Sequence, residues 1–358
     1  MIEERLRHLR CFLKKNNADA VIINKEVNLH YFSGFRGDDT LLLISAEKAI
    51  LVTDFRYTEQ ATAQAASYEI TEQKHGLWKA AADRINKEGW TNIAFEGNAL
   101  LFDDYARMQK LLEKAKLSKP LSLDALREIK EEEEIYCIRK AVSISDAAFK
   151  DILTFLRPGI SEIEVAARME QTMRELGSER PAFTTIVASG QRGSLPHGIA
   201  TEKLLVSGEF VTMDFGAVYK GYHSDITRTV CIGQADEKQK EIYSLVLSGQ
   251  LLGVSLVKPG ASGKVVDAAV RDLFSQKGFG KYFGHGLGHS LGLEIHESPR
   301  LSPSASDAHL VLGNLITVEP GIYIAGWGGI RIEDTVLVTA EGNEILTQSD
   351  KKLIEIYN

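Results

Sequence analysis

Three histidines fall within twelve positions of the stretch GHGLGHSLGLEIHESP at residues 284–299, namely His285, His289 and His296. Histidines four residues apart could share one face of a helix and hold a metal ion. The glycines of this stretch disfavour a helix, and apolar and polar residues alternate from 291 to 296. That period predicts a glycine loop leading into a half-buried strand. Any metal site here would therefore need further ligands from other segments.

Two aspartates flank the turn of a predicted hairpin at residues 209–233, EFVTMDFGAVYKGYHSDITRTVCIG. Lys220-Gly221 has the composition of a two-residue turn. Such a turn would place Asp214 and Asp225 on one face as diagonal neighbours, roughly 7 Å apart or less at Cβ. A loop of odd length would put them on opposite faces. The two-residue register pairs Tyr219 with Tyr222, Gly216 with Asp225 and Asp214 with Thr227, and Gly216 would leave open space beside the acids.

Two glutamates follow in the segment NLITVEPGIYIAGWGGIRIEDTVLVT at residues 314–339. Glu319 ends one strand-like run, and Glu333 shares a face of the next run with Arg331. The opposite face of that second run is predicted to point into the core. Its members are Ile330, Ile332, Val336 and Val338, with Asp334 as the polar exception.

These two hairpins suggest that Asp214, Asp225, Glu319 and Glu333 converge on one pocket. Each acid taken alone is more simply interpreted as a solvated strand residue. Together in one cleft the acids would repel one another, and burial would force some of them to take up protons. Two divalent cations would neutralise these charges. An oxygen-rich set with one imidazole, for which His289 is the best candidate, suits Mn, Fe or Co better than the thiolate-rich sets of structural zinc.

The other histidines are predicted to act beside the metals rather than on them. A lone histidine is more often a satisfied core or loop residue, but the nearby acids favour a functional role for His285 and His296. His197, in SLPHG, follows the segment 157–177 much as His296 follows the segment 258–278, and these two segments are the copies of an internal repeat. Two metals about 3.5–4 Å apart would make a bridging hydroxide and polarise a carbonyl. Histidines could then stabilise an oxyanion or protonate a leaving amine.

This combination predicts hydrolysis of an amide bond. Phosphoryl transfer is the chief competitor for a two-metal site. It is disfavoured because the sequence has no Gly-rich P-loop and offers one well-placed arginine.

The elements that would position these residues include an internal repeat. RPGISEIEVAARMEQTMRELG at 157–177 aligns without gaps to KPGASGKVVDAAVRDLFSQKG at 258–278. Each copy predicts a Pro-Gly helix stop, a serine N-cap and a second helix that ends at glycine, and Ser161 with Glu164 makes a capping box. Two independent solutions to one turn are the alternative, but a fixed offset favours duplication. We therefore expect pseudo-twofold halves with a site between them.

The first part of the chain alternates helix-like and strand-like runs, which predicts a small α/β unit. The charged helix opening at EEEEIYCIRKAV follows a predicted linker at 116–130, so we place the domains at residues 1–122 and 123–358. The predicted strands are AVIIN (20–24), TLLLIS (40–45) paired with AILVTD (49–54), and NIAFEG (92–97), with helices at the N-terminus, at 58–66 and at 104–116.

Composition predicts a soluble globular chain of 358 residues, with 44% hydrophobic and 25% charged residues. The net charge of −7 argues against a nucleic-acid partner. The apolar runs are too short to span a bilayer, and the N-terminus has no signal-peptide pattern. The three cysteines are far apart without a CxxC pair, as expected of reduced thiols in the cytoplasm.

The motifs MDFGAVYKGYHSDITRT, GHGLGHSLGLEIHESP, VEPGIYI and GGIRIEDT resemble, in order and spacing, those of the pita-bread (M24-type) metallopeptidases, which include aminopeptidase P, prolidase and methionine aminopeptidase. NLHYFSGFRG (28–37) and LVTDFRYTEQA (51–61) look like the extra domain of the Xaa-Pro branch. The resemblance implies a two-domain α/β and α+β protein. Its C-terminal domain would have the pita-bread fold with pseudo-twofold halves, and its N-terminal domain would be small and creatinase-like.

The resemblance implies a ligand set for a dinuclear centre, with Asp225 and Glu333 as the bridging pair. Glu319 would also accept a proton from the nucleophilic water. Thr335 stands where relatives often carry a second acid. The implied ligands are Asp214, Asp225, His289, Glu319 and Glu333.

Further roles implied by the resemblance fall on residues around the metals. His197 and His296 would bind substrate and stabilise the tetrahedral intermediate, and His285 matches another pocket histidine. Arg331 would support the site or meet a substrate carboxylate. The implied metals are two divalent ions, with Mn²⁺ preferred and Co²⁺, Fe²⁺ or Zn²⁺ as alternatives.

We expect from this resemblance a cytoplasmic, homodimeric exopeptidase that cleaves the N-terminal Xaa-Pro bond of short proline-containing peptides, without nucleic-acid or membrane partners. Aminopeptidase P-type action is preferred, with Xaa-Pro dipeptidase (prolidase) action as the alternative. Two alternatives belong to other classes: a metal-free hydrolase of the creatinase type and an inactive pita-bread binding module. The presence of all the implied ligands argues against both.

Overall fold

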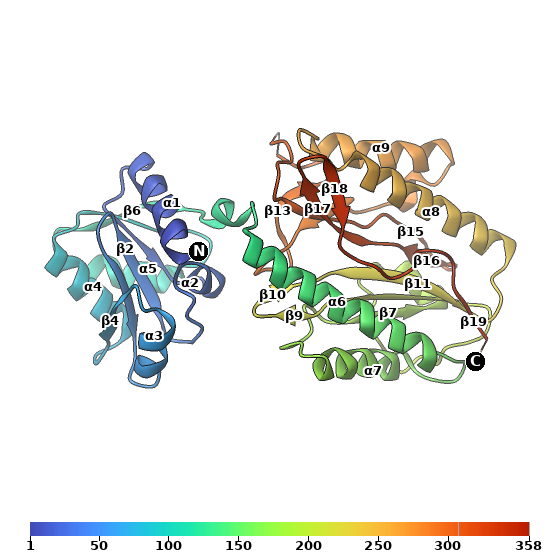
Figure 1. Ribbon diagram of the computed structural model, residues 1–358, viewed down its shortest axis with the longest axis horizontal. Helices are drawn as coiled ribbons and strands as arrows, with labels where there is room; N and C mark the ends of the chain where they lie inside the picture. Colours follow the sequence, from blue (N-terminus) through green and yellow to red (C-terminus); the bar gives the residue numbers. More distant parts are fainter. Residues whose placement is uncertain (307, 358) are drawn as a thin grey trace. The chain divides into compact units, whose positions relative to one another are not determined.

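The structure, a computed structural model, describes residues 1–306 and 308–357 and divides into two compact units, Met1–Arg127 and Glu128–Asn358 (Figure 1). Each unit has its own β-sheet structure and hydrophobic core. Among the described residues, no helix is both long and apolar enough to cross a membrane.

A mixed sheet with strand order β4-β3-β2-β1-β5-β6 organises the N-terminal unit. All residues of β1 and β2 are buried, as expected of strands covered on both faces. Side chains of α4 and α5 pack against one of these faces. The elements are α1 Ile2–Lys15, β1 Ala20–Ile23, α2 Glu26–Ser33, β2 Leu41–Ser45, β3 Ala49–Thr53, α3 Thr58–Gln64, β4 Glu69–Glu72, α4 Leu77–Glu88, β5 Asn92–Glu96, α5 Phe102–Leu111, β6 Lys116–Leu121 and the 3₁₀ turn η1 Asp124–Arg127.

The strands predicted for this unit are present as β1, β2, β3 and β5, and β2 pairs antiparallel with β3 as predicted. The predicted linker at 116–130 is wrong in its first half, which forms β6 and pairs parallel with β5. Pro120 is tolerated because β6 lies at the edge of the sheet, where a missing N–H costs little. The helix predicted at 104–116 ends earlier, at Leu111.

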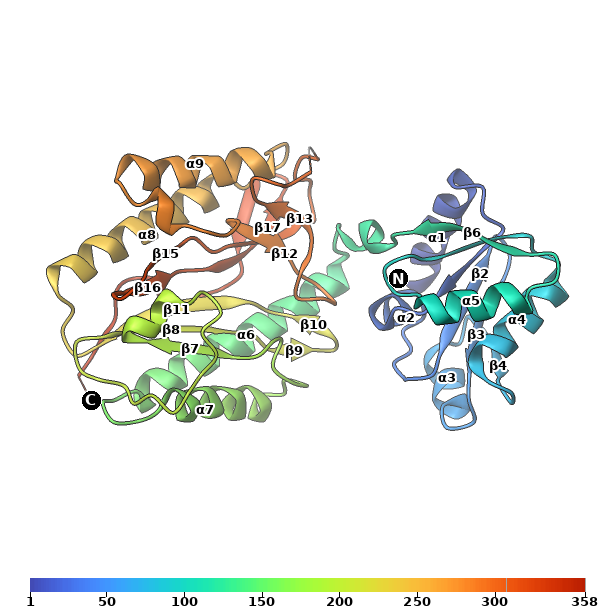
Figure 2. The ribbon, with the colours of Figure 1, turned by 180° about the vertical axis from the view of Figure 1, so that it is seen from behind.

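Helices α6 and α7 lie along one side of the C-terminal unit and α8 and α9 along the other, with strands between them (Figures 1 and 2). One core joins α6 and α7 to β7, β8 and β11, and another joins α8 and α9 to β14, β15, β16 and β17. The elements are α6 Glu132–Phe155, α7 Glu162–Glu175, β7 Ile186–Ser189, η2 Gly190–Ser194, β8 Phe210–Phe215, β9 Val218–Tyr219, β10 Tyr222–His223, β11 Ile226–Ile232, α8 Glu237–Leu256, α9 Gly263–Gln276, η3 Gly280–Tyr282, β12 Gly288–Ser290, β13 Glu297–Leu301, β14 Leu315–Val318, β15 Gly321–Ile324, β16 Gly328–Arg331, β17 Asp334–Thr339, β18 Gly342–Ile345 and β19 Glu355–Ile356.

The sequence repeat corresponds to a structural repeat. Helix α7 begins at residue 162 and ends at 175, and α9 begins at 263 and ends at 276, so both ends are offset by 101 residues (263 − 162 and 276 − 175). The Pro-Gly stops also match, because Gly159 and Gly260 adopt φ of 88° and 82°. These are left-handed conformations that favour glycine. The helix pairs α6–α7 and α8–α9 are thus equivalent parts of the two halves.

The two serine N-caps differ. Ser161 forms the predicted capping box with Glu164, whereas the side chain of Ser262 makes no cap hydrogen bond to its helix. The position equivalent to Glu164 is Val265, which cannot complete the reciprocal contact. The serine N-cap predicted for the second copy is therefore wrong as a side-chain cap.

This difference predicts unequal effects of removing the two hydroxyls. Ser161→Ala should lower the free energy of unfolding of the C-terminal unit by about 1 kcal/mol, because it leaves a helix N–H without its acceptor. Ser262→Ala, the matched control, should change it by less than about 0.5 kcal/mol. Urea unfolding of the full chain, followed by circular dichroism, measures both, and equal losses would contradict the assignment.

Candidate metal centre

A tight hairpin carries the two candidate aspartates. At its tip β9 pairs with β10, with Tyr219 opposite Tyr222. The turn residues Lys220 and Gly221 have φ of 49° and 83°, the left-handed conformations that a type I′ turn requires. The predicted two-residue register is therefore confirmed.

The same register continues into the longer strands, where Asp214 of β8 pairs with Thr227 of β11. Asp225 lies directly before β11 and is buried. Gly216 does not leave open space beside the acids, as the sequence suggested. A Cβ at this position would lie 1.9 Å from the carbonyl oxygen of Ser224. Glycine is therefore required there for the close approach of the two arms of the hairpin.

Three carboxylates from both halves of the unit meet at one point. Asp214, Asp225 and Glu333 each offer an oxygen within 4.8 Å of the others. Glu333 comes from the second half, between β16 and β17. Within the described part of the chain, Asp214 Oδ1 and Glu333 Oε1 are buried atoms with no hydrogen-bond partner. Such atoms are costly unless a ligand satisfies them.

Glu319 and His289 extend this cluster. Glu319 follows β14, and its Oε1 lies 3.3 Å from His289 Nε2. His289 Nε2 is also 3.6 Å from Asp225 Oδ2. The other ring nitrogen, Nδ1, lies 3.0 Å from the carbonyl oxygen of Ser290, which can only accept. Nδ1 therefore carries the proton, and the lone pair of Nε2 faces the carboxylates as a metal ligand requires.

The pKa values of the cluster indicate more buried negative charge than the neighbouring cations neutralise. Burial, followed by neighbouring acids, raises the pKa of Asp225 and Glu333 well above the usual carboxyl range. Burial also raises the pKa of Glu319 to about 8. It lowers the pKa of His289 to about 3, which keeps the imidazole neutral at physiological pH. The unpartnered oxygens, the raised carboxyl pKa values and the oriented imidazole fit bound divalent cations.

The remaining candidate histidines lie around this cluster. The His296 ring meets the His289 ring edge to face, with centroids 4.5 Å apart. His285 Nδ1 lies 2.8 Å from the carbonyl oxygen of Gly286, and burial lowers the pKa of His285 to about 4. His197 is exposed. Burial, followed by the charge of Arg300, lowers the pKa of His296.

The predicted strand at 291–296 is wrong, because these residues form bends between the short strands β12 and β13. The segment folds back when Gly292 N donates to Glu294 O over 3.0 Å. The buried Glu297 carboxylate holds it by accepting from Glu294 N and from Lys130 Nζ at 3.2 and 2.9 Å. This fold-back brings His296 to His289. Alternation alone cannot reveal it, because the Glu297 carboxylate that fixes the bend is itself held by Lys130, far away along the chain.

Arg331 links several parts of the site. Its guanidinium donates to Asp214 Oδ2 at 2.6 Å, to the Tyr323 hydroxyl at 2.8 Å and to Pro196 O at 3.2 Å. It also donates to Thr227 Oγ1 at 3.0 Å. Since Pro196 precedes His197, Arg331 connects the loop of His197 to a candidate ligand.

Sequence reasoning did not single out Thr227 and Tyr323. Thr227 Oγ1 donates to Glu333 Oε2 at 2.7 Å, and its place opposite Asp214 was a signal for this role. Tyr323 lies 2.8 Å from His285 Nε2. It pairs with Gly329 in the β15–β16 ribbon, so it is a diagonal neighbour of Arg331, a relation that appears only once the ribbon register is known.

Removal of Asp225 should abolish metal occupancy, because its carboxylate belongs to the cluster with Asp214 and Glu333 and lies 3.6 Å from His289 Nε2. We expect Asp225→Ala to retain its fold but to bind no metal ion after dialysis against Mn²⁺, as measured by elemental analysis. Asp151→Ala is the matched control, since Asp151 pairs with Arg168 away from the cluster. A fully metallated Asp225→Ala protein would contradict the site.

Metal binding should also release protons. Glu319, with a pKa of about 8, is largely protonated at pH 7 in the metal-free protein, and a ligand must be ionised. More protons should therefore leave per Mn²⁺ bound at pH 7 than at pH 9, where Glu319 is already ionised. Calorimetric titrations in buffers of different ionisation enthalpy measure this release, and an equal release at both pH values would contradict the raised pKa.

Comparison with known proteins agrees with this geometry. Residues 136–340 match the model of metallopeptidase family M24, and residues 5–129 match that of the Creatinase/Prolidase N-terminal domain. The chain is 39% identical over 360 residues to an Xaa-Pro dipeptidase of Pyrococcus horikoshii, covering 99% of each chain.

Solved structures give the same result over the whole length. An Xaa-Pro dipeptidase from Bacillus anthracis is similar with a TM-score of 0.97 and 44% identity, over 99% of this chain and 100% of the other. An X-Pro aminopeptidase from Thermotoga maritima MSB8 has a TM-score of 0.91 and 37% identity, over 98% and 100%. This protein therefore belongs to metallopeptidase family M24, with a creatinase-type N-terminal domain and a C-terminal pita-bread domain.

Proposed function

We propose that this protein is an Xaa-Pro dipeptidase, which hydrolyses the single peptide bond of dipeptides with proline in second position. The observation that carries the proposal is the cluster of half-buried Asp214 with buried Asp225 and Glu333, beside Glu319 and His289. Carboxylates and an imidazole gathered in this way are suited to hold a pair of divalent ions and to support hydrolysis of an amide.

The proposed ligands are those five residues, with Asp225 and Glu333 as the bridging pair. Both belong to the carboxylate cluster. Asp225 comes from the first half of the unit and Glu333 from the second, and an oxygen of one lies within 4.8 Å of an oxygen of the other. Bound cations would polarise the scissile carbonyl and lower the pKa of a water molecule. Mn²⁺ is the proposed metal, with Co²⁺, Fe²⁺ and Zn²⁺ as alternatives.

The proposed proton acceptor is Glu319. Its carboxylate stands at the edge of the cluster, where Thr317 donates a hydrogen bond to Oε1 at 3.3 Å. From there it could take a proton from water and pass it towards a leaving amine. Glu319→Gln would test this role, since an amide of the same shape cannot accept a proton.

The histidines are proposed to act on the substrate in different ways. His296 and the exposed His197 could donate hydrogen bonds to the substrate and to the oxyanion. His285 is already engaged on both ring nitrogens: Nδ1–H donates to Gly286 O, so Nε2 accepts from the Tyr323 hydroxyl. We assign His285 to holding Tyr323, which in turn accepts from Arg331.

The relatives' names favour dipeptidase over aminopeptidase P-type action, which the sequence had favoured. Proteins called Xaa-Pro dipeptidase match this chain at 39% and 44% identity over nearly its full length. The aminopeptidase from Thermotoga maritima matches at 37%. Aminopeptidase P-type action therefore stays as the second candidate.

A comparison of two substrates tests the proposal. The protein is stripped with chelator, reloaded with Mn²⁺ and given an Xaa-Pro dipeptide or an Xaa-Pro-Pro tripeptide. We expect Mn²⁺-dependent cleavage of the dipeptide, with little cleavage of the tripeptide, and loss of most turnover in Glu319→Gln. Release of free amino acid, measured by chromatography, gives both rates.

Each other outcome selects another function. Efficient cleavage of the tripeptide would establish aminopeptidase P-type action. Cleavage that survives complete metal removal would indicate a hydrolase of the metal-free creatinase type. Absence of cleavage of either peptide, in protein that binds Mn²⁺, would favour the binding module.

A further inference from the structure

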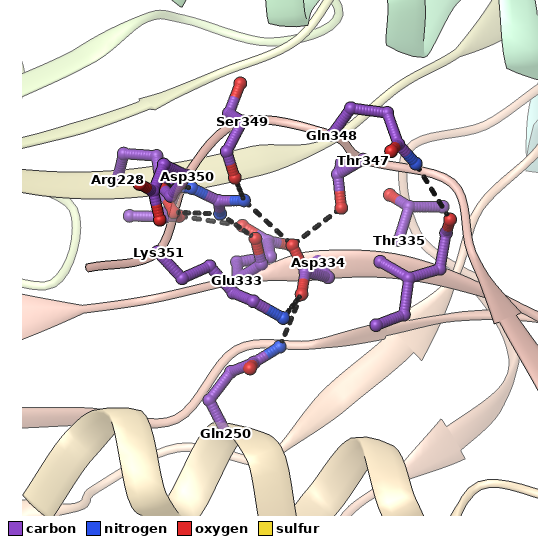
Figure 3. A network of polar contacts seen from close by, with 12 residues as sticks. Arg228, Gln250, Glu333, Asp334, Thr335, Thr347, Gln348, Ser349, Asp350 and Lys351 are labelled. Atoms are coloured by element: carbon purple, nitrogen blue, oxygen red, sulfur yellow. Dashed lines mark hydrogen bonds and ion pairs between the residues drawn. The ribbon is translucent and has the colours of Figure 1, made fainter.

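A second buried cluster of charges lies behind the carboxylates and takes no part in the proposed chemistry. Its centre is Asp334, whose side chain is fully buried. Asp334 accepts hydrogen bonds from Arg228 at 2.9 Å, Gln250 at 2.8 Å and Thr347 at 2.6 Å, and it also pairs with Lys351 (Figure 3). The alternation of side chains along the strand places Asp334 on the face that points into the core. These hydrogen-bond donors explain how an acid is accommodated there.

Arg228 connects this cluster to the backbone of the candidate metal site. Its side chain is 1% exposed. Besides Asp334 (Figure 3) it donates to the carbonyl oxygen of Glu333 and, over 2.9 Å, to that of Thr227. The same guanidinium donates to the carbonyl oxygens of Ser349 and Asp350 at 2.8 and 3.0 Å. One cation therefore ties two strands and the C-terminal segment together.

The two strands concerned belong to opposite halves of the unit. Arg228 is on β11 and Asp334 begins β17. Successive residues of an extended chain point to opposite sides. Thr227, one residue before Arg228 on β11, and Glu333, which directly precedes β17, accordingly join on the other side. They do so through the 2.7 Å hydrogen bond from Thr227 Oγ1 to Glu333 Oε2. The ion pair and the metal-site contact are thus two sides of one junction.

Further contacts make this junction rigid. Glu333 N donates to Thr227 O at 3.1 Å. The hydroxyl of Thr335 donates to Asp225 O at 2.9 Å. The segment 333–335 therefore fixes the backbone at both proposed bridging carboxylates, Asp225 and Glu333, and Arg228 with Asp334 fixes the segment.

We propose that Arg228 and Asp334 form a positioning pair, which holds the carboxylates of Asp225 and Glu333 at the spacing that two divalent cations need. This inference rests on the proposed metal ligands. A buried ion pair is weak support for stability alone, because desolvation offsets much of its attraction. We assign it a geometric role instead: it sets where β11 and β17 meet, and the proposed bridging ligands Asp225 and Glu333 are the residues directly before these two strands.

The C-terminal segment offers a control that separates positioning from stability. Asp146 of α6 holds the same segment, accepting from Gln348 N, Ser349 N and Ser349 Oγ at 2.9, 2.9 and 2.5 Å. Asp146 is not among the partners of Asp334 or Arg228 in the described chain. Asp146→Ala should therefore loosen the segment and leave the ion pair in place.

The test is the affinity of the full-length, metal-stripped protein for Mn²⁺, measured by calorimetry together with urea unfolding of the metal-free form. We expect Asp334→Asn to weaken binding of at least one Mn²⁺ by about tenfold or more, the range seen when a group that orients a ligand is removed. Asp146→Ala should leave Mn²⁺ affinity within about twofold, even where it lowers stability.

Milder variants keep the inference testable if Asp334→Asn does not fold. Arg228→Lys retains the charge but loses the forked contacts to Glu333 O and Thr227 O, so it should also weaken Mn²⁺ binding. Wild-type Mn²⁺ affinity in folded Asp334→Asn or Arg228→Lys would overturn the positioning role. An equal loss of affinity in Asp146→Ala would overturn it too, by making the effect one of stability. Failure of the wild type to bind Mn²⁺ would instead reject the proposed metal site itself.

Discussion

Repulsion between buried carboxylates is the constraint on which the C-terminal unit depends. Asp214, Asp225 and Glu333 lie within 4.8 Å of one another, with Glu319 close by. Acids so placed cannot all be ionised without compensation. Burial, followed by the charge of neighbouring acids, accordingly raises the pKa of Asp225, Glu319 and Glu333. A fold that nevertheless gathers these acids needs strands that are held together against the repulsion. It also needs bound cations that neutralise the carboxylates.

The architecture meets this need by bringing two similar halves together at their strands. Each half has a helix pair and a core of its own, in which its strands pack against its helices. The junction between the halves is then fixed on one side by Thr227 and Glu333 and on the other by Arg228 and Asp334. Arg331 adds a cation at the edge, where it pairs with Asp214 and reaches the loop of His197.

Family membership and local geometry constrain the function to different degrees. Membership of metallopeptidase family M24 makes the protein a hydrolase of peptide bonds. The histidines differ in what the geometry leaves open to them. His289 presents a free lone pair to the carboxylates, His285 is committed on both nitrogens, and His296 lies against His289. Distinct hydrogen-bond environments thus divide similar side chains among different tasks.

Local chemistry in the sequence determined the hairpin of Asp214 and Asp225, the capping box at Ser161 and the repeat that gives α7 and α9 their common offset. Such features depend on turn residues and on contacts within a few positions, which a sequence displays directly. Most strands of the N-terminal sheet were predictable for the same reason, whereas β6 was mistaken for a linker because edge strands tolerate proline and polar residues.

Tertiary structure alone decided the fold-back at 291–296, which a distant lysine and a buried glutamate hold in place. It also decided the environment of Asp334. The alternation of side chains along the strand predicted that this acid points into the core. It could not predict the partners Arg228, Gln250 and Lys351, because they come from other segments of the chain. Contacts between distant segments depend on how the two halves pack, and periodicity carries no information about that packing.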